Sequence, residues 1–129
     1  MNNIAWRILI ICGIFDLGFA FFHLMFWKIF LWKEDLASLT FINRSIMQIL
    51  NLCLTFVFLT MAYVAFFHQP EMISTNLGKA LLIASSLFWF FRMIEQMVFF
   101  GIKNRVSFML TPTIFAGSVF HLLPVFVKA

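Results

Sequence analysis

Charged residues are scarce in this sequence, and their scarcity excludes an ordinary soluble domain. Only 11% of the residues are charged, whereas 64% are hydrophobic, and 20 of the 129 are phenylalanine. Soluble domains are about a quarter charged and about half apolar. Here the apolar excess falls into blocks that are long enough to cross a bilayer. The composition therefore predicts an integral membrane protein, with the lipid bilayer as its main partner.

Cysteines and the familiar catalytic motifs are also rare or missing. The two cysteines, Cys12 and Cys53, lie within apolar segments and match neither a disulfide framework nor a CxxC metal site. The sequence contains no HExxH motif, no cluster of histidines and no Ser/His/Asp motif. Its cations are scattered singly and form no basic patch. We therefore expect no metal site and no nucleic-acid partner, and the motifs do not favour an enzyme.

Four apolar blocks predict an all-α fold, an integral membrane four-helix bundle that forms one transmembrane domain without a soluble domain. The predicted spans are residues 4–27, 41–67, 77–100 and 106–127, and an amphipathic segment at the membrane surface covers residues 28–33. Thr40 and the segment 74–76 are expected to cap the second and third spans. Pro70 ends the second span, and Pro112 and Pro124 are expected to kink or shorten the fourth.

The distribution of the cations predicts how the spans cross the membrane. The positive-inside rule places the side with more Lys and Arg in the cytoplasm. The first and third loops and their flanks carry the larger group, which is Lys28, Lys33, Arg44, Lys103 and Arg105. The opposite side carries Arg7, Lys79 and Lys128. We therefore expect extracytoplasmic termini and cytoplasmic first and third loops, and we assign the protein to the bacterial inner membrane.

Each predicted span carries one polar stripe at helical spacing. The stripes are Asp16, Ala20, His23 and Trp27; Arg44, Gln48, Asn51 and Thr55; Ser85, Phe88, Arg92 and Glu95, with Gln96 alongside; and Thr111, Ile114, Ser118 and His121. Residues at i, i+4 and i+7 share one face of a helix. The other faces are apolar, as lipid contact requires, so the stripes are expected to converge on one interior. The predicted lining is Asp16, His23, Gln48, Asn51, Arg92, Glu95, Gln96 and His121.

Depth in the membrane limits which of these groups can meet. A rise of about 1.5 Å per residue, counted from the cytoplasmic edge, sorts them into levels. The shallow level holds His23, Gln48 and Glu95; the deeper level holds Asp16, Asn51 and Arg92; and His121 lies nearest the outer side. We therefore expect an ion pair between Asp16 and Arg92 and a network within the shallow level.

Three interpretations of this polar interior stay open. In the first, the polar groups only hold the helices together, and the protein is a structural or accessory subunit. In the second, which we favour, Asp16 and Glu95 titrate and the interior binds a small polar or cationic species or relays protons. Arg92 would tune the two carboxyls, and His23 would pass protons to the cytoplasmic side. At this length only one modest cavity fits, so we expect a homo-oligomer or a place in a larger membrane complex.

The third interpretation is a redox subunit that binds a b-type haem or a quinone. Neutral imidazoles are good iron ligands, and a helical bundle can hold a macrocycle. However, the expected depths of His23 and His121 differ too much for both to bind one haem. Haem and quinone therefore remain possible cofactors that we do not favour.

The architecture resembles that of the small multidrug antiporters. Those proteins also have four spans and an essential carboxylate in the first, which corresponds to Asp16 here. The resemblance covers the architecture and Asp16 only.

Overall fold

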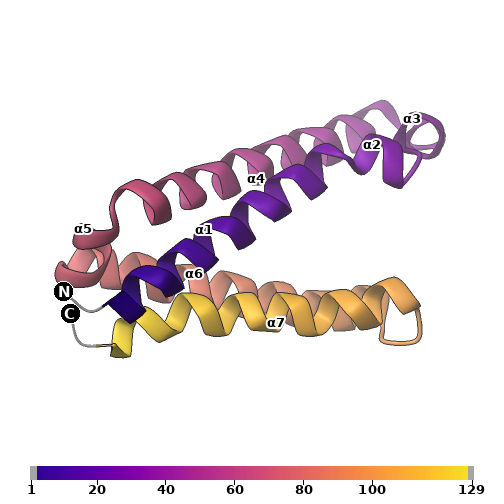
Figure 1. Cartoon of the computed structure of the whole chain (residues 1–129). Coiled ribbons are helices and arrows are strands. Elements are labelled where there is room, and N and C mark those ends of the chain that lie inside the picture. The colour runs from indigo at the N-terminus through magenta and orange to yellow at the C-terminus, as the bar shows by residue number, and fades with distance from the viewer. Residues whose placement is uncertain (1–2, 128–129) are drawn as a thin grey trace. The chain divides into compact units, whose positions relative to one another are not determined.

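The computed structural model describes residues 3–127, and within this range the chain is almost entirely helical and has no strand (Figure 1). Four long helices make up most of it. The elements are α1 (Asn3–Leu24), α2 (Phe26–Ile29), α3 (Trp32–Asp35), the 3-10 turn η1 (Leu36–Ser38), α4 (Phe41–Phe67), α5 (Gln69–Ser74), α6 (Asn76–Glu95), the π-helix η2 (Gln96–Phe100) and α7 (Arg105–Phe126).

The four long helices are long and apolar enough to cross a membrane. The spanning segments are Ile4–Leu24, Phe41–Phe67, Asn76–Phe100 and Arg105–Phe126. The predicted all-α fold with four membrane spans is therefore confirmed, and the chain is a small helical membrane protein. The side on which each loop lies remains a prediction, and Lys128, which entered that prediction, is outside the described residues.

Most of the predicted helix ends are correct. The Thr75 side chain accepts a hydrogen bond of 2.9 Å from the backbone N–H of Gly78 and so caps α6. Asn104 caps α7 in the same way through Val106, and α4 ends just before the segment that contains Pro70. The first span is shorter than predicted, because α1 ends at Leu24 rather than at residue 27.

The predicted surface segment 28–33 is not one continuous helix. It is divided between α2 and α3, and Leu31 between them has a φ of 51°, in the left-handed region. A leucine in this conformation is strained, because its Cβ crowds the backbone. The chain therefore turns sharply at Leu31, where the sequence pattern predicted continuation.

Helix α7 continues through Pro112 and Pro124, so neither proline shortens it, and the expected kink stays a prediction. A proline lacks the N–H that would bond to the carbonyl four residues earlier. For Pro124 that carbonyl belongs to Phe120, and the Cys12 thiol donates to it at 3.2 Å. Membrane helices tolerate proline when a neighbouring group satisfies the released carbonyl in this way.

The chain forms two compact units, which we describe separately. The α6–α7 unit comprises residues 3–12 and 64–127 of the described chain, and the α1–α4 unit comprises residues 13–63. The predicted single domain stays a prediction. The core of the α6–α7 unit is the cluster of Ala5, Leu9, Cys12, Ala65, Met72, Ile73 and Leu82. There α6 and α7 run alongside each other as an antiparallel hairpin (Figure 1).

Candidate functional site

The most specific polar contact of the α1–α4 unit joins His23 of α1 to Asn51 of α4. The ring Nδ1 of His23 and Oδ1 of Asn51 are 2.8 Å apart. The Nδ2 of Asn51 donates to the backbone carbonyl of His23 at 2.9 Å. Both residues are buried. Because one amide group binds the ring and the backbone of the same residue, the imidazole has a fixed orientation.

The geometry also assigns the tautomer of His23. The Asn51 amide nitrogen faces the His23 carbonyl, so the carbonyl oxygen of the amide faces the ring. A carbonyl oxygen only accepts hydrogen bonds, and therefore Nδ1 must carry the proton. In the neutral ring the lone pair is then on Nε2.

Aromatic rings surround this imidazole. Phe26 stacks on it, with ring centroids 4.5 Å apart and an interplanar angle of 23°. Phe58 of α4 and Phe22 of α1 are edge-on to it, with ring centroids 5.2 Å and 6.0 Å from that of the imidazole, respectively. The electron-rich face of a stacked ring also accommodates a cation, so this enclosure can accept the protonated imidazole.

Two further polar groups of the α1–α4 unit are buried. Asp16 lies on α1 seven residues before His23, and its side chain is fully buried. Thr55 lies one turn after Asn51 on α4 and donates to the Asn51 backbone carbonyl at 2.9 Å. Asp16, His23, Asn51 and Thr55 are the polar seam of this unit, and the sequence pattern predicted all four.

Gln48 has a different place from the one predicted. It was expected to bond with His23, but its Nε2 donates to the backbone carbonyl of Arg44 at 3.2 Å and the side chain is half-buried. The partner of His23 lies one turn further along α4.

In the α6–α7 unit, a reciprocal pair of serines joins the two helices. The hydroxyl of Ser86 donates to the carbonyl of Ser118 at 2.8 Å, and the hydroxyl of Ser118 donates to the carbonyl of Ser86 at 2.9 Å. The two hydroxyl oxygens are 3.2 Å apart. Small residues of this kind let the backbones of membrane helices approach closely. Ser86 was not among the predicted stripe residues.

Gln96 begins η2 and is buried, as the stripe predicted. Its Nε2 donates to the hydroxyl of Ser107 at 3.1 Å, and that hydroxyl donates to the carbonyl of Gly101. Its Oε1 accepts no hydrogen bond from the described part of the chain. These bonds close the loop between α6 and α7, where the last turn of the helix widens into a π-helix.

The remaining predicted residues of the α6–α7 unit differ in exposure. His121 is buried, and its Nδ1 is 2.7 Å from the carbonyl of Gly117 on the same helix. Arg92 is half-buried and interacts electrostatically with Glu95, which lies three residues later and is exposed. The predicted role of Glu95 in lining a polar interior stays a prediction. Asp16 and Arg92 belong to different units, and their ion pair stays a prediction.

Sequence reasoning missed two contacts, those of Cys12 and Ser86. Cys12 was noted only as lying within an apolar segment, and Ser86 was not singled out. A signal existed for Cys12, because a proline inside a membrane helix releases a carbonyl that some neighbour must satisfy. For Ser86 no such signal existed, because Ser85 beside it is equally small and equally polar.

Within residues 3–127, no group of three or more His, Cys, Asp or Glu side chains is placed to hold a metal ion. Comparison of the chain with protein-family models, with curated proteins and with solved structures finds no match.

Proposed function

We propose that this membrane protein relays protons, or binds a small polar or cationic species, at the polar seam of the α1–α4 unit. The observation that carries the proposal is the pair of hydrogen bonds between Asn51 and His23. Together they orient one imidazole among aromatic side chains. An ionisable group inside a membrane span is expensive to bury and is a functional candidate by default.

His23 supplies the group that changes charge near physiological pH. Its Nδ1 proton is held by Asn51, so proton uptake takes place at Nε2. The imidazolium that forms keeps its bond to Asn51 and remains stacked on Phe26.

Asp16 supplies the second titrating group of the seam. It lies on the same face of α1 as His23, about 10 Å away along the helix axis at 1.5 Å per residue. At that separation the two groups exchange a proton only through an intervening water or polar species. The seam can therefore act as a proton path along α1 with two titrating groups. Asp16 lies nearer the middle of the helix, and His23 lies nearer the end that is followed by α2.

The test is proton flux into liposomes that contain the purified protein and a trapped pH-sensitive dye. We expect wild-type protein to raise the flux under an imposed membrane potential. Asp16→Asn and His23→Gln should reduce it to the level of protein-free liposomes. His68→Gln and Glu71→Gln, exposed residues outside the spanning helices, are matched controls and should retain the wild-type flux.

A second candidate is a structural or accessory membrane subunit, and the α6–α7 unit favours it. There the hydroxyls of Ser86 and Ser118 and the thiol of Cys12 each donate to a backbone carbonyl of a neighbouring helix, an arrangement that holds helices together. If both seam variants fold and conduct protons as the wild type does, this second function is the correct one.

A further inference from the structure

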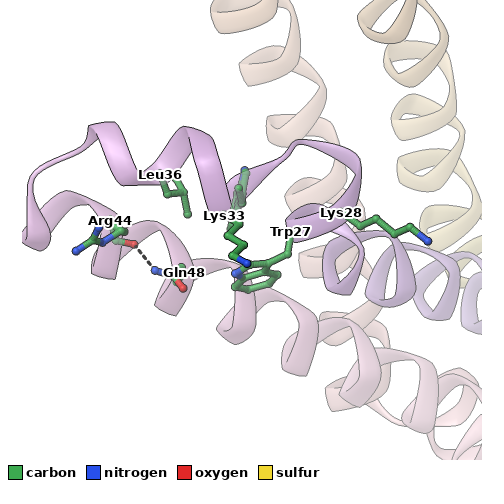
Figure 2. A pocket seen from close by; sticks show the side chains of 7 residues that line it. Trp27, Lys28, Lys33, Leu36, Arg44 and Gln48 are labelled. Atoms are coloured by element: carbon green, nitrogen blue, oxygen red, sulfur yellow. Dashed lines mark hydrogen bonds between the residues drawn. The ribbon is translucent and has the colours of Figure 1, made fainter.

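The α1–α4 unit contains an open groove outside the polar seam. It lies between the α2–α3 segment and the first turns of α4, and its volume is about 450 Å³ (Figure 2). Three cations and two indoles line it, together with Gln48 and Leu36, and no carboxylate does. The cations are Lys28, Lys33 and Arg44, and the indoles are Trp27 and Trp32.

The sharp turn at Leu31 builds this groove. Its left-handed conformation separates α2 from α3, and the backbone N–H groups of Glu34 and Asp35 both donate to its carbonyl at 2.9 Å. The turn brings the ring of Trp32 to 5.1 Å from that of Trp27, at an angle of 67°. Backbone strain of this kind persists only where the surroundings enforce it, and it clusters at binding sites.

The cationic side chains of the groove extend in different directions. Figure 2 shows Lys33 beside the ring of Trp27, whereas Lys28 and the guanidinium of Arg44 extend away from it on opposite sides. Gln48 is held at the base by its bond to the Arg44 carbonyl. The two carboxylates of α3, Glu34 and Asp35, do not line the groove.

We propose that this groove binds the phosphate of an anionic phospholipid headgroup. Trp side chains are enriched at the membrane interface, where an apolar ring meets a polar surface. Clustered Lys and Arg beside a membrane helix attract anionic lipids, and Arg recognises phosphate with two parallel hydrogen bonds. The groove joins both features at the end of a spanning helix, where lipid phosphates lie.

The experiment measures which lipids stay with the protein. Wild-type protein is extracted in mild detergent from bilayers of equimolar phosphatidylglycerol and phosphatidylcholine, and the retained lipids are quantified by mass spectrometry. We expect retention of phosphatidylglycerol over phosphatidylcholine. Lys28→Gln/Lys33→Gln should lower this preference by roughly fivefold per cation removed, and Arg44→Gln by at least as much.

A matched variant separates the groove from general surface charge. Lys103→Gln/Arg105→Gln removes the same charge from exposed positions in the loop after η2 and at the first residue of α7, and it should keep the wild-type preference. An equal loss in this variant would overturn the proposal, as would unchanged preference in the groove variants with wild-type helical content by circular dichroism.

A second arm distinguishes the source of the phosphate. Soluble glycerol phosphate is added during extraction at a concentration that matches the lipid. Continued retention of phosphatidylglycerol supports a lipid site. If glycerol phosphate displaces the lipid, and the groove variants also lose binding of glycerol phosphate, the proposed lipid site would be overturned. The ligand would then be a soluble phosphate ester.

Discussion

The two units of this chain use buried polar groups in different ways. In the α6–α7 unit, hydroxyl and thiol groups of small residues donate to backbone carbonyls of the opposite helix. In the α1–α4 unit, a titratable ring and an amide bind each other among aromatic side chains. The first arrangement allows close approach of backbones, whereas the second leaves a group that can change charge. Polarity inside a membrane therefore does not identify function until its partners are known.

The glycines of the two units should show the largest contrast. A Cβ at Gly78, in the first turn of α6, would overlap the backbone of Glu71 and Met72, which cannot move aside easily. A Cβ at Gly18 of α1 would meet nothing within 4 Å. We expect Gly78→Ala to lower the free energy of unfolding in detergent by about 3 kcal/mol. Gly18→Ala should leave it unchanged or raise it by up to about 1 kcal/mol. Equal effects would show that the α5–α6 contact is not close-packed.

The Asn51 bond should give the next largest effect. Asn51→Leu leaves the His23 ring nitrogen and carbonyl without this partner, and we expect a loss of about 2 kcal/mol in the free energy of unfolding. Thr60→Val, on the same helix, removes only a bond to the carbonyl four residues earlier and is exposed. Its effect should be close to zero. A loss in Thr60→Val as large as that in Asn51→Leu would mean that α4 responds to any polar deletion.

The effects of substituting Ser86 and Ser118 on stability should be coupled, because the two hydroxyl oxygens are 3.2 Å apart and also contact each other. Ser86→Ala and Ser118→Ala are each expected to lower the free energy of unfolding by about 1 kcal/mol. The double variant should lose less than the sum of the two. Ser85→Ala is the control, since Ser85 bonds only to Leu81 of its own helix among the contacts described. Strict additivity in the double-mutant cycle would contradict a reciprocal pair.

The thiol contact should give the smallest effect and the most specific one. Cys12→Ala is expected to lower the free energy of unfolding by about 0.5 kcal/mol, because a thiol is a weak donor. In a Pro124→Ala background residue 124 regains the N–H that reaches the Phe120 carbonyl. The effect of Cys12→Ala should then disappear. A loss of the same size in both backgrounds would assign the role of Cys12 to packing alone.

Much of the fold could be predicted because it depends on local or composition-level physics. Apolar length predicted the four spans, and the hydroxyl of Thr75 marked the start of α6. The stripe pattern placed Asp16, His23, Asn51 and Thr55 on buried faces, since helical periodicity alone decides which residues share a face. Glu95 is exposed, and its predicted place in a shared polar interior stays a prediction.

The sequence by itself determined that this protein is helical and membrane-spanning, because no other backbone arrangement satisfies its polar groups across such long apolar segments. It also determined that ionisable groups would lie within the spans. Only the tertiary structure decided that His23 pairs with Asn51 rather than Gln48, that Cys12 serves the carbonyl released by Pro124, and that the turn at Leu31 forms a cationic groove. These choices depend on the register between helices and on single backbone angles, which residue patterns along one chain do not encode.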